Sequence, residues 1–207
     1  GSFPSFARHF AAGNNQIVYD WMPADLDTPV SAYLKLTQTE TYAFLLESVE
    51  GGAVLGRYTI IGFDPDVIWM AEDHTLPLES LRDLLAQSAI ETIPEGLPPM
   101  AGSGLFGYLS YDMIRHVEKI DDKNPDTLGL SDSIFFRPRA LVVFDNIMHK
   151  ICIIAPIYTH AKSNPKNQSD AALHAEALAR IASIKDKLAA PLQISHATSK
   201  LSSPLPV

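Results

Sequence analysis

The sequence predicts an α+β fold in which mostly antiparallel, sandwich-like sheets are flanked by helices. Strand-like segments follow one another through turns too short for a crossover helix. Helical patterns mark three main segments, at 28–36, 77–89 and 169–189, and a short helix is expected from Tyr111 to about Glu118; these lie between and after the strands. There is no internal repeat. Strands grouped apart from helices are typical of the α+β class.

Composition describes a globular chain and excludes several classes of partner. The 207 residues are 46% hydrophobic and 19% charged, with a formal net charge of −8 and a pI near 5.3. We expect no nucleic-acid partner, because phosphate binding requires a basic surface. We expect no membrane partner, because the chain contains no apolar run of 18 residues. The single cysteine, Cys152, excludes an internal disulfide and favours a cytoplasmic location.

The first quarter of the chain predicts an arm, a strand and a helix. Residues 1–16 carry spaced phenylalanines and favour a loose arm or short helix that buries an aromatic ring. Residues 17–22 favour a strand. Thr28 and Pro29 are typical of the start of a helix that runs to about residue 36, with Val30, Tyr33 and Leu34 facing inward.

Three strands are then predicted in succession, at 41–48, 57–63 and 66–72. Gly51-Gly52 and Asp64-Pro65 separate them as turns. The short connections predict an antiparallel meander.

The remaining elements are two helices and a hairpin. Leu78, Leu81, Leu84 and Leu85 define an amphipathic helix over 77–89. Strands at 139–144 and 148–154 flank a turn at Asp145-Asn146. A long helix over 169–189 begins at Ser169 or Asp170, and the polar segments 120–133 and 159–168 are expected at the surface.

A polar cluster stands at the end of the predicted strand 41–48. Both faces of this strand are apolar up to its end, which predicts a covered strand. Glu47, Ser48 and Arg57 would therefore be buried and would require partners. They either satisfy one another in a strand-end cluster or bind a ligand. Glu47 and Ser48 alternate across the strand, so both reach one ligand only if the strand ends or bulges there.

No catalytic constellation is visible in the sequence. The seven histidines share no metal-ligand spacing, and there is no nucleophile elbow or P-loop. Gly102, Gly104 and Gly107 do not lie in a strand–turn–helix unit, and close packing or bending of strands explains them better than nucleotide binding. The acidic residues Asp64, Asp66, Glu72 and Asp73 are expected to be solvated in a turn.

Three segments together resemble one enzyme family. LLESVEGG at 45–52, GRYTIIGFDP at 56–65 and GSGLFGYLSYD at 102–112 are similar to the N-terminal half of anthranilate synthase component I, of the chorismate-utilising enzymes. The resemblance extends from Thr28 to the proline-rich residues 204–206. It implies a lyase of tryptophan biosynthesis that converts chorismate to anthranilate with ammonia from a glutamine amidotransferase subunit.

The resemblance also implies a domain organisation. It assigns 1–16 to an N-terminal arm, 17–190 to the regulatory domain, and 191–207 to a linker toward a C-terminal chorismate-binding domain. The catalytic residues and Mg²⁺ would then belong to that C-terminal half, so we expect no catalytic residue, metal or cofactor in this chain and no activity from it alone. Surfaces that normally pack against the C-terminal half would promote self-association.

The resemblance further implies that this chain binds the feedback inhibitor L-tryptophan. Leu46, Glu47 and Ser48 match the inhibitor-binding strand, and Arg57 and Tyr58 align with the strand that follows. A hydroxyl and strand-end carbonyls can bind the ammonium, Arg57 can bind the carboxylate or orient Glu47, and apolar side chains can contact the ring.

Two other functions remain open on the sequence. One is the related aminodeoxychorismate synthase component of folate synthesis, because the residues that decide between the two enzymes are expected in the C-terminal half. The other is a freestanding amino-acid-binding module with no enzyme attached.

Overall fold

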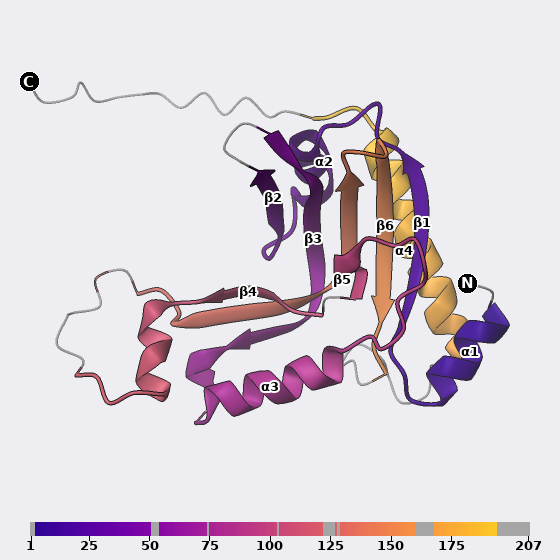
Figure 1. The fold of residues 1–207 in the computed structure, drawn as a ribbon. Helices are drawn as coiled ribbons and strands as arrows, with labels where there is room; N and C mark the ends of the chain where they lie inside the picture. The colour runs from indigo at the N-terminus through magenta and orange to yellow at the C-terminus, as the bar shows by residue number, and fades with distance from the viewer. Residues whose placement is uncertain are drawn as a thin grey trace, which may run out of the picture.

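The chain folds around a six-stranded antiparallel sheet, within the residues that its computed structural model describes: 3–50, 54–73, 75–102, 104–121, 127, 129–159 and 168–193 (Figure 1). The strands are β1 (Gln16–Pro23), β2 (Phe44–Glu50), β3 (Val54–Met70), β4 (Phe106–Leu109), β5 (Ser133–Asp145) and β6 (Lys150–Ile157). The α-helices are α1 (Phe3–Ala11), α2 (Pro29–Thr37), α3 (Pro77–Ser88) and α4 (Asp170–Ala189). Short 3-10 helices span Ala71–Asp73, Pro99–Gly102 and Tyr111–His116. This arrangement confirms the predicted α+β class with a mostly antiparallel sheet and flanking helices. The described strands form one sheet, however, and not the expected sandwich-like sheets.

The sheet runs in the order β1-β6-β5-β3-β2, and β4 pairs with β5 beside this path. The predicted hairpin is β5–β6, with Leu141 opposite Ile154 and Asp145 opposite Lys150. β1 returns to pair with β6 and not with the strand that follows it in sequence. β2 therefore forms one outer edge of the sheet.

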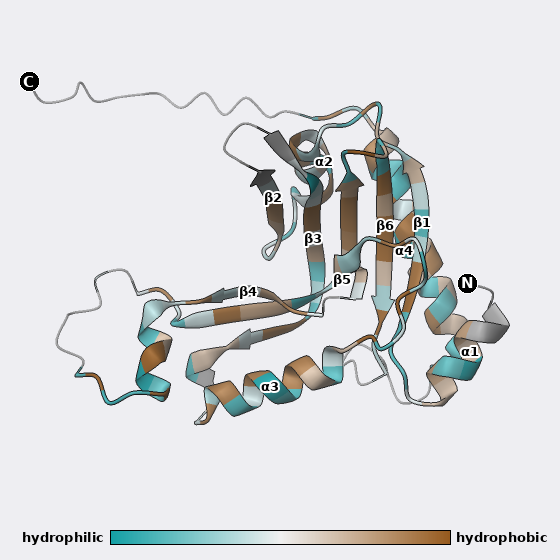
Figure 2. Cartoon of the chain, viewed as in Figure 1, coloured by the Kyte–Doolittle hydropathy of each residue, from teal (hydrophilic) through white to brown (hydrophobic). Residues whose placement is uncertain are grey.

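Both faces of the central strands are buried. In β6, Ile151 and Ile153 face α1, α2 and α4, while Cys152 and Ile154 face the opposite side. The helical face holds the larger core, to which α4 contributes its predicted stripe of Leu173, Ala177, Ile181, Ile184 and Leu188. Figure 2 shows the resulting apolar colour along β3, β5 and β6. Burial on both faces explains why these strands read as nearly continuous apolar runs.

The second face is covered by the irregular segment between α3 and β4. Ile90, Leu97, Met100 and Ala101 of this segment pack against strand residues. Tyr19, Trp21, Tyr58 and Ile60 lie on the same face and remain partly exposed. Of these residues, Tyr58 and Ile60 belong to β3, so they place an aromatic and an apolar side chain beside β2.

β3 bends sharply in its middle, and the bend corrects the predicted meander. The segments 57–63 and 66–72 were expected as separate strands, but β3 runs through both and pairs with β5 on each side of Asp64-Pro65. Asp64 adopts a φ of 55°, and the register shifts between Pro65 and Val67. A bulge thus replaces the expected turn, and Figure 1 shows β3 and β5 turning together.

The bend pairs acidic residues that were expected to be solvated with arginines. The Asp66 side chain has no exposed surface and accepts two hydrogen bonds from Arg137, of 2.8 and 2.7 Å. Asp64 forms ion pairs with Arg139 and with Arg180 of α4. The expectation of a solvated turn is therefore wrong for these two residues, because the bulge directs them toward arginines.

α2 begins as predicted but faces the core differently. Thr28 and Ser31 form a reciprocal capping box, with Pro29 in the first turn. Val30 and Leu34 were expected inward, yet they are 51% and 43% exposed. The buried stripe is Ala32 and Leu36. Tyr33, the third residue expected inward, is partly buried and does pack against the core.

The terminal expectations are partly tested. α1 is the predicted short helix, and Phe6 is buried against His174 of α4. Ser169 caps α4 by accepting a hydrogen bond from the Ala172 amide. α3 agrees with the leucine spacing, although Leu85 is exposed. The expectations for 160–167 and 194–207 concern positions outside the described residues.

Candidate functional site

The pairing of β2 with β3 breaks at Ser48. Glu47 lies opposite Thr59, and the next pair is Val49 with Leu55. Ser48 alone therefore opposes the three residues Gly56–Tyr58 of β3. Irregularities of this kind redirect side chains and occur beside functional sites. From the sequence, Glu47 and Ser48 were expected to reach one ligand only if the strand ends or bulges at this point. A bulge is present, and it brings Ser48, Arg57 and Tyr58 together.

Gly56 makes room for the Ser48 side chain. A Cβ atom at Gly56 would lie 1.8 Å from the Ser48 Oγ, so no other residue fits without moving Ser48. The Ser48 hydroxyl donates to the Tyr58 carbonyl at 3.4 Å, which is long for an O–H···O bond. Because Ser48 is exposed, its hydroxyl can still bind a ligand.

Arg57 binds Asp145 and not Glu47. Its Nε and Nη2 donate to the Asp145 carboxylate at distances of 2.9 to 3.3 Å. The Arg57 side chain is 45% exposed, whereas that of Asp145 is 2% exposed. The guanidinium also lies 4.8 Å from the centre of the Tyr58 ring. The expectation that Arg57 orients Glu47 is therefore wrong, because the β5 carboxylate is closer and buried.

Leu46 and Glu47 lie on opposite faces of the sheet. Leu46 pairs with Ile60, which packs on the second face together with Tyr58, and period-2 alternation places Ser48 there too. Glu47 lies opposite the buried Thr59, on the face that carries the helices. Three of the five candidate residues, Leu46, Ser48 and Tyr58, thus share one face.

This strand end is exposed, contrary to the sequence expectation. Leu46 is 49% exposed, and Glu47 and Ser48 are exposed as well. β2 was expected to be covered because apolar residues alternate on both of its faces. In the described residues it is an outer strand, so its end is accessible to a ligand.

The turn between β5 and β6 supports this site and was not predicted as part of it. The Asn146 amide donates to the Arg57 carbonyl at 2.8 Å, and its Nδ2 donates to the Gly56 carbonyl at 2.8 Å. The Ile147 and Met148 amides both donate to Asp145 Oδ1 at 3.1 Å. Asp145-Asn146 was recognisable as a turn, but its contact with β3 spans about 90 residues and leaves no local signal.

The hydrogen bonds to Asp145 keep it ionised. Burial by itself raises the pKa of its carboxyl, but hydrogen bonds from Arg57 and from the Met148 and Ile147 amides outweigh this effect. The pKa of Asp145 therefore lies below its ordinary 3.8. The same pair raises the pKa of Arg57, chiefly through the hydrogen bond to Asp145.

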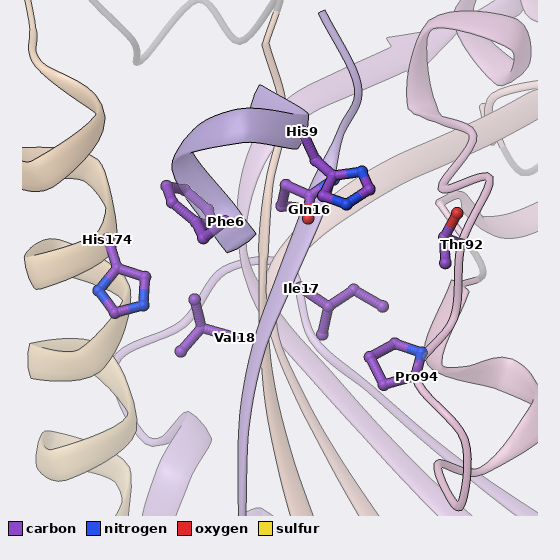
Figure 3. A pocket seen from close by; sticks show the side chains of 8 residues that line it. All are labelled: Phe6, His9, Gln16, Ile17, Val18, Thr92, Pro94 and His174. Atoms are coloured by element: carbon purple, nitrogen blue, oxygen red, sulfur yellow. The ribbon is translucent and has the colours of Figure 1, made fainter. Parts of the chain in front are cut away.

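A separate cavity of about 130 Å³ lies between α1, β1 and α4 (Figure 3). It is lined by Phe6, His9, Gln16, Ile17, Val18, Thr92, Pro94 and His174. Figure 3 shows His9 and His174 on opposite sides of Phe6. None of the five candidate residues lines this cavity.

Neither a membrane-spanning helix nor a metal cluster occurs in the described residues. Their helices lack the length and apolar character needed to span a bilayer. No three or more of their His, Cys, Asp or Glu side chains are grouped so as to hold a metal ion.

Comparison with known proteins gives consistent names. No protein-family model matches the chain. Anthranilate synthase component 1 of Cereibacter sphaeroides is 46% identical over 178 residues, covering 76% of this chain and 35% of that protein. Probable anthranilate synthase component 1 of Schizosaccharomyces pombe is 42% identical over 142 residues, covering 68% and 28%.

A solved structure has a related name. Anthranilate synthase component I from Streptococcus pneumoniae TIGR4 matches with a TM-score of 0.46 and 23% identity, over 78% of this chain and 36% of that one. The chain spans about a third of the length of the curated relatives it matches. Over about two thirds to three quarters of its length, this chain is thus similar in sequence to proteins named anthranilate synthase component 1.

Proposed function

We propose that this chain is the regulatory portion of an anthranilate synthase large subunit and binds L-tryptophan as a feedback inhibitor. The complete enzyme would convert chorismate to anthranilate with ammonia from a glutamine amidotransferase subunit. Chorismate and Mg²⁺ would be bound by the portion of the enzyme outside this chain. Both curated relatives carry the name anthranilate synthase component 1, which supports this identity for the complete enzyme.

The observation that carries the proposal is the bulge at Ser48. It gathers a hydroxyl, a guanidinium and a tyrosine ring at an exposed strand end, beside the partly exposed Ile60. An aromatic amino acid presents an ammonium, a carboxylate and a large apolar ring, so this set of groups is complementary to it. Arg57 would bind the carboxylate, and Ser48 with the neighbouring carbonyls would bind the ammonium.

Leu46 and Tyr58 would contact the ring, since both lie on the second face. Glu47 lies on the opposite face of the sheet. We therefore propose that it does not contact the ligand and affects the site only through β2. The remainder of the pocket would come from the portion of the enzyme outside this chain.

Inhibition would work as a coupling between two sites. Tryptophan would favour one arrangement of this chain and the catalytic portion, and chorismate would favour the other. Coupling free energies of about 1–3 kcal/mol correspond to roughly 5- to 150-fold changes in affinity, and they act equally on both ligands.

A substitution at Ser48 tests the proposal in the complete enzyme. We expect Ser48→Phe to fill the site and abolish tryptophan inhibition while leaving the turnover of chorismate. Ser183→Phe, at an exposed serine of α4, is the matched control and should remain inhibited. Normal inhibition of the Ser48→Phe enzyme would contradict the proposal.

The two alternatives are less well supported. Neither an aminodeoxychorismate synthase component nor a freestanding amino-acid-binding module corresponds to the relatives named above. A complete protein that binds tryptophan but forms no anthranilate from chorismate would support the binding module instead.

A further inference from the structure

The turn that begins at Asp145 holds only part of the Arg57 guanidinium. Arginine carries five N–H donors in a planar fork. Asp145 occupies the edge formed by Nε and Nη2. Among the described residues, no acceptor binds the other edge, formed by Nη1 and the second hydrogen of Nη2. That edge belongs to a side chain that is nearly half exposed, so it is accessible to a second carboxylate.

Asp145 is itself fixed in place. Its Oδ1 accepts from the Ile147 and Met148 amides, and both of its oxygens accept from Arg57. The side chain is almost fully buried. A carboxylate that accepts hydrogen bonds from several directions has little freedom to move. It therefore holds its arginine partner in a narrower range of orientations than a solvated carboxylate does.

Asn146 fixes the backbone of the same segment. Its amide and its side chain donate to the carbonyls of Arg57 and Gly56, which are two of the three residues opposite Ser48. The turn therefore controls both the direction of the arginine and the shape of the bulge.

We propose that Asp145 and Asn146 are positioning residues of the effector site, and that they direct the free edge of Arg57 toward the α-carboxylate of the ligand. This inference rests on the proposed function. Asp145 neutralises most of the charge on Arg57, so the carboxylate is recognised through paired hydrogen bonds more than through net attraction. The site should consequently distinguish an α-amino acid from the corresponding amine.

Tryptophan and tryptamine provide the test, because tryptamine lacks only the carboxylate. Both are titrated calorimetrically into the complete large subunit, as wild type, Asp145→Asn and Arg57→Lys. Asp145→Asn keeps an acceptor for the turn amides but removes the charged partner of Arg57. Arg57→Lys keeps the positive charge but removes the planar set of N–H donors. It provides the test if Asp145→Asn does not fold.

We expect both variants to weaken tryptophan binding about tenfold or more, with little change for tryptamine. The matched control is Asp20→Asn, which removes a carboxylate of β1 that is paired with Lys185 of α4. This variant should bind both ligands normally. Equal weakening for tryptophan and tryptamine would show a purely structural role and overturn the inference. Unchanged binding in both variants would overturn it as well. Failure of the wild type to bind tryptophan would instead refute the proposed function, and the inference with it.

Discussion

Cys152 illustrates how burial sets the chemistry of a single residue. It lies in β6 with no exposed surface and packs on the second face beside Val143 and Ile154. Desolvation is the main reason that its pKa is raised to about 12. Since the thiolate is the reactive form, the thiol should be inert in the folded chain.

We therefore predict that Cys152 resists modification by Ellman's reagent until the chain unfolds. The measurement follows the release of the coloured product with and without denaturant. One thiol should react rapidly in urea and none within the same time in buffer. Rapid reaction under native conditions would place Cys152 at the surface.

Asp145 should make stability depend on pH. Its folded pKa lies below the ordinary 3.8, so the unfolded chain takes up the proton first. The stabilisation is therefore complete above that value and is lost as the pH falls through it toward the folded pKa. Above this window, wild type should be more stable than Asp145→Asn, and the difference should shrink on acidification.

Urea unfolding of both chains between about pH 6 and pH 3 measures this effect. Asp83→Asn, at an exposed aspartate of α3, is the control for a general loss of charge. A stability difference that stays constant across this range would show that Asp145 has no lowered pKa.

Residue identities could be predicted around Ser48, but their exposure could not. The sequence indicates that Glu47 and Ser48 require a bulge to reach one ligand, and the register break follows Glu47. Apolar alternation cannot distinguish a covered strand from an outer one, because that depends on strand order. The partner of Arg57 was missed because Asp145 is 88 residues away in sequence.

The bend of β3 shows how one element depends on a buried ion pair. The side chains of Arg137 and Asp66 are 1% and 0% exposed. The guanidinium also donates to Ser88 and lies 4.0 Å from the centre of the Tyr158 ring. Such a pair stabilises little relative to apolar residues, but removal of one partner leaves an unpaired buried charge.

We predict that Arg137→Met lowers the free energy of unfolding by about 3–5 kcal/mol. Replacement of both partners, as in Arg137→Met with Asp66→Leu, should recover much of this loss. Lys185→Met removes a far more exposed ion pair with Asp20 and should cost less than about 1 kcal/mol. Urea unfolding measures all three variants, and equal losses for the exposed and buried pairs would refute this account of the bend.

For individual helices and strands, the sequence predicted correctly those features that depend only on residues close together in the chain. The capping box of α2 and the stripe of α4 follow from spacing alone. Asp64-Pro65 was misassigned as a turn because a bulge and a turn use the same residues. Gly107 of β4 agrees with the predicted close packing of strands, since a Cβ there would lie 1.9 Å from the Ile134 carbonyl oxygen of β5.

The whole molecule leaves apolar surface at the outer edge of its sheet. β2 is the last strand on that side, and Leu46 is exposed on it. Exposed outer strands can pair with a second chain. The fold class was predictable from the grouping of strands, but the strand order was not, because β1 pairs with β6 across the length of the domain.

We predict that the 207-residue chain self-associates through this edge. In sedimentation velocity, the weight-average sedimentation coefficient should rise with concentration. Leu46→Lys should suppress the rise because it places a charge on the edge. Leu26→Lys, at a leucine 97% exposed in a loop, should leave it unchanged. A coefficient that is independent of concentration would show that the chain stays monomeric.

The proposed function of the molecule as a whole depends on the binding of tryptophan at Ser48. Calorimetric titration of L-tryptophan into the complete large subunit measures it without reference to turnover. We predict saturable binding to the wild type that is lost in Ser48→Phe and retained in Ser183→Phe. Equal binding to the wild type and the Ser48→Phe subunit would contradict the account.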